Sequence, residues 1–324
     1  MERRRFYIET INKNVKLIKE VQGNGCFDYN YNNKLSSYPN ARMQEAVASL
    51  AWIYSKGNKK IKGKIEEGID FWCKIQKKSG YFSEHSKYEQ SFAATAYSTA
   101  AIGYAISIIG MDDKWKTHLR LASEWLTKNN ELILINQQAA AALSLFYTSK
   151  ILKSGEYKLA AEIKLKNVLK SQKGYFPEKN SFDLGYSTLT LYLLTRIHQI
   201  TKKREIIQST EQFLEYFIKQ EFPKNIRNTN WIIIGGFEYL ANKCKSGEKA
   251  LKIVLENYNT NHLPDTRHIC TDLIQFCLAY DNVNVNKSKI PRIFVQEKIK
   301  NKPSKILNII RPFGLHKIRN WWYK

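Results

Sequence analysis

The sequence predicts an all-α protein, an (α/α)6 toroid of six helical hairpins, and three observations support this prediction. The 324 residues include only 15 Gly and 7 Pro, which is typical of helical proteins rather than loop-rich β-sandwiches and barrels. One pattern recurs six times along the chain, at intervals of 41 to 55 residues. Within each repeat a charged amphipathic segment precedes an uncharged apolar segment, the order expected of an outer helix followed by an inner helix.

The recurring pattern is clearest in two segments that begin at Ser79 and Lys173. Each contains Gly-Tyr-Phe-x-Glu, then a short polar loop and a long apolar helix. Their phenylalanines, Phe82 and Phe176, lie 94 residues apart, which is two repeats. The other four repeats are marked by Phe27, Thr127, Pro223 and Pro264.

The charged segments predict the outer helices. Residues 61–76, 115–126, 157–172 and 205–220 each place apolar residues at helical spacing and keep one charged face. The uncharged helices need neighbours on both sides, so the repeats must stack, either in a closed ring or in an open HEAT-like solenoid. We favour the ring, because the concave face of a solenoid would normally be more polar.

One uncharged run, from Gln90 to Met111, is long enough to span a bilayer. Serine and threonine interrupt it, and alanine outnumbers the large aliphatic residues. We therefore expect a helix that is buried within the protein rather than a transmembrane helix.

Two short phrases resemble a known family. Gly174 to Leu194 (GYFPEKNSFDLGYSTLTLYLL) resembles the helical toroid domain of heparinase II/III-type polysaccharide lyases. The stretch from Asn136 (NQQAAAALSL) is similar to an inner helix of the same group. The resemblance implies an α/α toroid with a cleft and a connection to glycan metabolism. Such lyases carry a β-sandwich after the toroid and are usually exported, and neither feature is visible here.

A weaker resemblance involves Trp72-x3-Gln76-x3-Gly80-x-Phe82, which is similar to the QW-type repeat motif of triterpene cyclases. Terpenoid cyclases and protein prenyltransferases also use α/α toroids. The acidic DxDD motif of the cyclases and the zinc ligands of the prenyltransferases are absent from this sequence. Toroids host many reactions, so neither resemblance fixes the function.

Polar residues just before the inner helices are expected to line one cavity, because the loops that enter these helices converge on one face of a ring. The candidate catalytic residues are Asn136, Tyr186, Tyr88, His85, Glu178 and Asp183. The candidate substrate-binding residues are Arg42, Glu84, Gln137, Asn230, Trp231, Arg267 and His268.

The lyase resemblance implies particular roles for some of these residues. Asn136 would neutralise a uronate carboxylate, and Tyr186 or Tyr88 would transfer the proton. His85 or His268 would act as a second base. A hydrolase would instead need two carboxylates about 5–10 Å apart, for which Glu84, Glu178 and Asp183 are available. The structural alternative is that these residues cap helices and anchor the packing of neighbouring repeats.

The sequence favours a carbohydrate-active or carbohydrate-binding toroid that acts in cell-surface polysaccharide metabolism or assembly. If it is catalytic, we expect a polysaccharide lyase or a glycoside hydrolase. Two alternatives stay open: an isoprenoid- or terpenoid-handling toroid with Trp231, Tyr97 and Tyr104 facing an aromatic cavity, and a non-catalytic helical-repeat scaffold. No cofactor and no metal are expected, because the sequence has no Gly-rich phosphate loop, HExxH motif or Cys/His ligand pattern.

The last 42 residues form a basic extension (283–324) after the toroid domain (1–282). They contain 11 Lys and Arg and one acidic residue, and so carry +10 of the formal net charge of +23. Cations beside clustered aromatic residues predict contact with an anionic membrane surface, and packing of the tail on the toroid is the alternative. The membrane-surface candidates are Arg311, Lys317, Arg319, Trp321 and Trp322. We do not expect nucleic-acid binding, which only the charge supports.

Cysteine usage and the N-terminus bear on location. The five cysteines form no CxxC pair, and an odd number suits reduced thiols better than a disulfide framework. No apolar segment follows the N-terminal arginines, so no secretory signal is expected. The sequence predicts a cytoplasmic protein, either free or at the membrane periphery, whose partner is a glycan or a lipid-linked glycan.

Overall fold

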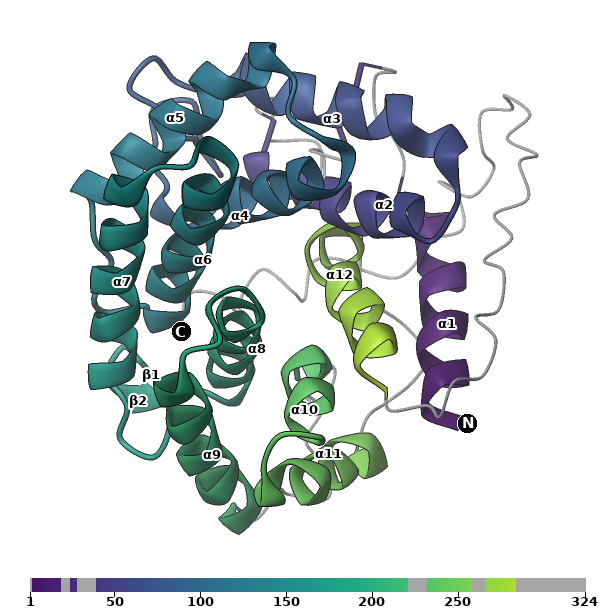
Figure 1. The fold of residues 1–324 in the computed structure, drawn as a ribbon, viewed down its shortest axis with the longest axis vertical. Helices are drawn as coiled ribbons and strands as arrows, with labels where there is room; N and C mark the ends of the chain where they lie inside the picture. Colours follow the sequence, from purple (N-terminus) through teal and green to yellow (C-terminus); the bar gives the residue numbers. More distant parts are fainter. Residues whose placement is uncertain (1, 19–23, 28–38, 221–231, 258–265, 284–324) are drawn as a thin grey trace.

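The computed structural model describes residues 2–18, 24–27, 39–220, 232–257 and 266–283. Within these residues, twelve helices alternate between the outer and the inner layer of a ring (Figure 1). The outer helices are α1 (Glu2–Val15), α3 (Lys62–Ile75), α5 (Asp113–Lys128), α7 (Gly155–Lys170), α9 (Arg204–Lys219) and α11 (Lys245–Asn257). The inner helices are α2 (Ala46–Ser55), α4 (Phe92–Ile109), α6 (Ile135–Leu152), α8 (Leu184–Thr201), α10 (Ile234–Leu240) and α12 (Thr266–Asn282).

The inner helices close on themselves. Each contacts the next one along the chain, and α12 contacts α2, while α1 packs against α12 from outside (Figure 1). An open solenoid would keep its first and last repeats apart, so the predicted (α/α)6 toroid is confirmed. A two-stranded hairpin, β1 (Pro177–Glu178) with β2 (Ser181–Phe182), lies in the loop before α8.

The two layers differ as the sequence pattern predicts. On the outer helix α9, Ile206, Phe213 and Phe217 are buried along one face, whereas the opposite face is charged. The inner helix α4 is long and apolar enough to cross a membrane by length and composition, and most of its residues are buried between α2, α5 and α6. This is the environment expected of an uncharged helix in the centre of a stacked array.

The loops that enter three inner helices share a Gly-x-Phe turn. The first residues of these turns, Gly25, Gly80 and Gly174, have φ angles of +81°, +93° and +81°, a region that favours glycine. A Cβ atom on Gly80 would lie 2.2 Å from the backbone oxygen of Leu121 on the next outer helix. The glycine therefore lets the loop lie directly on that helix, and the phenylalanine two residues later enters the core. The three phenylalanines are Phe27, Phe82 and Phe176, all fully buried.

The residues that resemble a QW-type motif join neighbouring repeats. The Trp72 ring stacks on Phe82 at 4.7 Å, and its Nε1 donates a hydrogen bond to Ser98. The Gln76 amide donates to the backbone oxygens of Gly80 and His118, at 3.1 and 2.9 Å. These contacts give the motif a structural role in this chain.

The basic extension begins where the described part of the chain ends. Residues 284–324, including the five membrane-surface candidates, lie outside the described residues. The domain boundary, the membrane contact and the cytoplasmic location therefore stay predictions.

Candidate functional site

The N-terminal ends of the inner helices carry a connected group of polar side chains, which we call the inner-face network. It consists of Arg42, Glu45, Glu84, Tyr97, Asn136 and Glu178, and it joins four consecutive repeats. All six side chains are largely buried. Local capping holds the backbone around them: Asn40 Oδ1 accepts from the N–H of Arg42 at 2.8 Å, and Ser91 Oγ accepts from the N–H of Ala94 at 3.0 Å.

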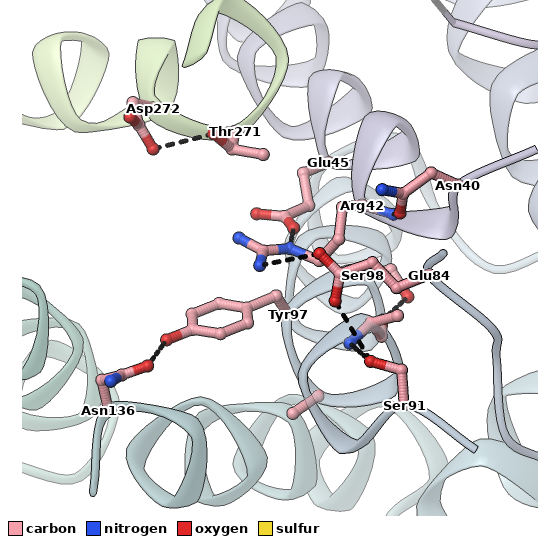
Figure 2. A network of polar contacts seen from close by, with 12 residues as sticks. Asn40, Arg42, Glu45, Glu84, Ser91, Tyr97, Ser98, Asn136, Thr271 and Asp272 are labelled. Atoms are coloured by element: carbon pink, nitrogen blue, oxygen red, sulfur yellow. Dashed lines mark hydrogen bonds and ion pairs between the residues drawn. The ribbon is translucent and has the colours of Figure 1, made fainter. Parts of the chain in front are cut away.

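Arg42 is the central cation of the network. Its guanidinium forms an ion pair with Glu45 and lies 3.9 Å from Glu84, and it stacks over the Tyr97 ring at 4.2 Å (Figure 2). Burial disfavours the charge of Arg42, but attraction by Glu45 and Glu84 outweighs it and raises the pKa of Arg42. The cation therefore stays charged at all accessible pH values. Ser91 donates a hydrogen bond to the second oxygen of Glu84 at 3.1 Å, which fixes that carboxylate.

The network continues from Tyr97 to the neighbouring inner helix. The Tyr97 hydroxyl donates a hydrogen bond to Asn136 Oδ1 (Figure 2). Asn136 Nδ2 donates in turn to Glu178 Oε1 at 2.5 Å, and the backbone N–H of Asn136 donates to the same oxygen at 3.0 Å. Helix α6 has no side-chain cap of its own, so Glu178 from the following repeat occupies that position.

Glu178 is the carboxyl group with the most unusual environment. Its relative exposure is 3%, and while Oε1 accepts two hydrogen bonds, Oε2 has no hydrogen-bond partner among the described residues. Burial raises the pKa of Glu178 to about 7, against the hydrogen bonds from Asn136, and the charge of Asp183 adds to the rise. Near neutral pH this group can therefore hold a proton on a side chain of fixed orientation.

Glu45 is a second buried carboxyl group whose pKa is raised. Burial raises the pKa of Glu45 against the attraction of Arg42, and the negative charges of Asp272 and Glu84 add to the rise. Asp272 lies on α12, which packs beside α2 where the ring closes, so a charge of the last repeat also acts on Glu45 (Figure 2).

The other predicted site residues have different positions. Asp183 caps α8 by accepting from the N–H of Tyr186 at 2.9 Å, and both residues are half-buried. Gln137 and His268 are also half-buried. The His85 side chain is exposed although Nε2 lies 3.8 Å from Glu84, and Tyr88 is 87% exposed. Asn230 and Trp231 lie outside the described residues, as does the side chain of Arg267.

Two further features bear on ligand binding. The described residues contain no group of three or more His, Cys, Asp or Glu side chains that could hold a metal ion. A groove of about 440 Å³ lies on the outer surface between α7 and α9, lined in part by Leu165, Leu169 and Lys203. It contains none of the predicted site residues.

Comparison with solved structures adds to this geometry. The chain shares its fold with a mannanase. Two structures of the GH76A α-1,6-mannanase from Salegentibacter sp. HEL1_6 match with a TM-score of 0.60 and 10% sequence identity, over 85% of this chain and 98% of the mannanase chain. One of them is an inactive variant, in which two consecutive aspartates are replaced by alanine, in complex with α-1,6-mannotetrose. No protein-family profile matches the chain, and no curated protein matches its sequence.

At 10% identity the likeness establishes the toroid fold and no more. Neither structure is a heparinase-type lyase, so the lyase resemblance is supported only as far as the toroid. Sequence reasoning gave site roles to Arg42, Glu84, Asn136 and Glu178. It also placed Glu45 at the cavity, among the polar residues before the first inner helix, but without a role, and it assigned Tyr97 only to the isoprenoid alternative. The spacing of three residues between Arg42 and Glu45, which puts both on one helical face, is the signal that indicates their pairing.

Proposed function

We propose that this protein is a glycan-active toroid that hydrolyses glycosidic bonds, with Glu178 as the proton donor. The observation that carries the proposal is the environment of Glu178: a buried carboxyl group held through one oxygen, with the other free of hydrogen bonds among the described residues. It lies at the inner-helix face of a fold that this chain shares with an α-1,6-mannanase.

Glycoside hydrolysis requires an acid that protonates the leaving oxygen and a second carboxylate that acts as base or nucleophile. An acid with a pKa near the working pH donates most effectively, and burial gives Glu178 a pKa of about 7. Asp183 is the candidate second carboxylate, because its charge is close enough to raise the pKa of Glu178. One of its oxygens caps α8, which holds the side chain in place.

The remainder of the inner-face network suits sugar recognition. Arg42, Asn136 and Glu84 supply donors and acceptors that match the hydroxyl groups of a pyranose. Tyr97 adds an aromatic ring with a polar tip. In the structure these side chains contact one another. The hydroxyl groups of a bound glycan would therefore replace hydrogen bonds that the side chains make within the network. The Tyr97 hydroxyl is bonded to Asn136, which gives this surface the polarity of a glycan site rather than of an isoprenoid cavity.

The inactive mannanase variant has two consecutive aspartates replaced, which raises the question of whether this chain has such a pair. Its sequence contains a single Asp-Asp pair, Asp112–Asp113, which opens the outer helix α5. The pair follows the C-terminal end of α4, so it is separated from the inner-face network by the length of that helix, about 27 Å. The proposed mechanism therefore relies on Glu178 and Asp183 rather than on adjacent aspartates.

The direct test is release of reducing ends from a panel of oligosaccharides. The panel should include α-1,6-linked mannotetraose, other neutral oligosaccharides and uronate-containing ones. The products should also be followed by the ultraviolet absorbance of a 4,5-unsaturated uronate, which is the lyase product. We expect hydrolysis of at least one member without this absorbance. Formation of unsaturated product would support a lyase instead, and binding without cleavage would contradict the role of Glu178 as proton donor.

A further inference from the structure

A second polar cluster lies deeper in the ring than the inner-face network. Arg196 on α8 is surrounded by the rings of Tyr104 on α4, Tyr147 on α6 and Tyr192 on α8, with its guanidinium carbon 5.1, 5.7 and 5.7 Å from their centroids. Arg196 Nη2 donates a hydrogen bond to the Tyr147 hydroxyl at 3.1 Å. We call these four residues the Arg196 cluster.

The cluster occupies one level of three consecutive inner helices. Tyr104, Tyr147 and Arg196 are each twelve residues beyond the first residue of their own helix. At 1.5 Å per residue, this level lies about 18 Å along the helices from the end that carries the inner-face network. The Arg196 cluster is therefore a separate group of residues, although it belongs to the same ring interior.

The charge of Arg196 is not balanced by any carboxylate among the described residues. Arg196 is 5% exposed, and its Nε makes no hydrogen bond within the described part of the chain. The charge of Asp281 acts on Tyr104, but its two carboxylate oxygens accept from Trp52 Nε1 at 2.7 Å and Lys56 Nζ at 2.5 Å.

Two other buried cations among the described residues pair with carboxylate, carbonyl or amide oxygens, whereas Arg196 has only a phenolic oxygen. Arg42 lies between two glutamates, and Lys164 donates to Asn129 O at 2.6 Å and to Asn130 Oδ1 at 2.9 Å. Arginine stays protonated in proteins, so Arg196 cannot escape the cost of burial by losing its proton. The surrounding aromatic faces reduce this cost but leave the Nε–H donor unused.

We propose that the Arg196 cluster binds an oxyanion, the carboxylate or phosphate group of a small ligand. A guanidinium presents paired N–H donors that match either group, and tyrosine hydroxyls can add further hydrogen bonds. Tyr104 is only partly buried, so this level is not sealed by the helices. The formal net charge of +23 would also raise the local concentration of anions. The inference does not depend on glycan hydrolysis.

The test compares the melting temperatures of the wild type and Arg196→Met in buffers with and without inorganic phosphate, sulfate or glucuronate. Methionine has a similar shape without the charge, so without oxyanion we expect Arg196→Met to melt above the wild type. A bound oxyanion should raise the melting temperature of the wild type by about 4 °C at roughly 100 times its Kd and leave Arg196→Met unchanged. The lead of Arg196→Met over the wild type should therefore shrink as the oxyanion concentration rises.

Two controls make the result specific. Lys164→Met removes a buried cation that has partners, and it should melt below the wild type in every buffer. Tyr147→Phe keeps the packing and removes one hydrogen bond, so calorimetric titration should show about fivefold weaker binding. A response to phosphate and sulfate alone would identify a phosphate ligand, and a response to glucuronate alone a carboxylate ligand. Equal responses of wild type and Arg196→Met, or none in either, would overturn the proposal.

Discussion

Glu178→Gln should reduce hydrolysis by roughly 100- to 10,000-fold, the usual contribution of a general acid. Glutamine keeps the oxygen that accepts from the backbone and side chain of Asn136, so the loop and the α6 cap should be preserved. It cannot donate a transferable proton to the leaving oxygen. The loss should therefore appear in kcat rather than in the affinity for the oligosaccharide.

Glu131→Gln is the matched control for this variant. Glu131 lies in the loop before α6, close enough to influence Glu178, and its Oε1 accepts from the N–H groups of Ile133 and Leu134. The glutamine should keep these bonds and near-wild-type activity. Equal activity of Glu178→Gln and Glu131→Gln would show that Glu178 is a structural cap and not the acid.

The same substitution changes the pH dependence of stability. The pKa of Glu178 is raised from 4.5 to about 7 in the folded state, so between these values the unfolded chain releases a proton that the folded chain retains. Unfolding is therefore favoured as pH rises, and the wild type should lose up to about 3 kcal/mol from this group by pH ~8. Urea unfolding should show Glu178→Gln close to the wild type near pH ~4 and more stable near pH ~8.

Gly80→Ala should destabilise the fold by at least ~3 kcal/mol. The residue has a φ of +93°, which disfavours any L side chain, and the new Cβ would lie 2.2 Å from Leu121 O. The Leu121 oxygen is a backbone atom and the new Cβ is bonded directly to the backbone, so neither can rotate away. The contact can be relieved only by moving the loop away from α5. The loop also carries Phe82, so the displacement would disturb its stacking on Trp72.

Gly57→Ala separates these two effects. Gly57 has a φ of +108°, but no atom lies within 4 Å of the position of its Cβ. Alanine at this position should lower the free energy of unfolding only by the cost of holding an L residue at positive φ, about 1 kcal/mol. If denaturant unfolding gives the same loss for both variants, the close approach of the Gly80 loop to α5 would contribute nothing to stability.

The ring itself was predictable because its determinants are local and repeated. A buried helix must be uncharged, an outer helix must keep one charged face, and each Gly-x-Phe turn needs a glycine where φ is positive. The runs around Phe82 and Phe176 show all three features in the sequence. Stacking of such units leaves few arrangements, of which the closed ring is one.

The contacts within the site were less predictable, because they join residues of different repeats. Nothing in the sequence near Glu178 indicates that it caps α6 or holds Asn136, forty-two residues earlier. The Arg196 cluster was missed for a different reason. Arg196 is a cation inside α8, an inner helix that contains no other lysine, arginine, aspartate or glutamate, and that position alone could have identified it as unusual.

The most direct test of the proposed function is a crystal structure of Glu178→Gln with the oligosaccharide that the panel selects, starting with α-1,6-linked mannotetraose. We expect the sugar at the inner-face network, in contact with Arg42, Tyr97 and Asn136, and a glycosidic oxygen within hydrogen-bond reach of residue 178. A sugar bound only in the outer groove between α7 and α9, or an inner face that stays closed at saturating oligosaccharide, would contradict the account.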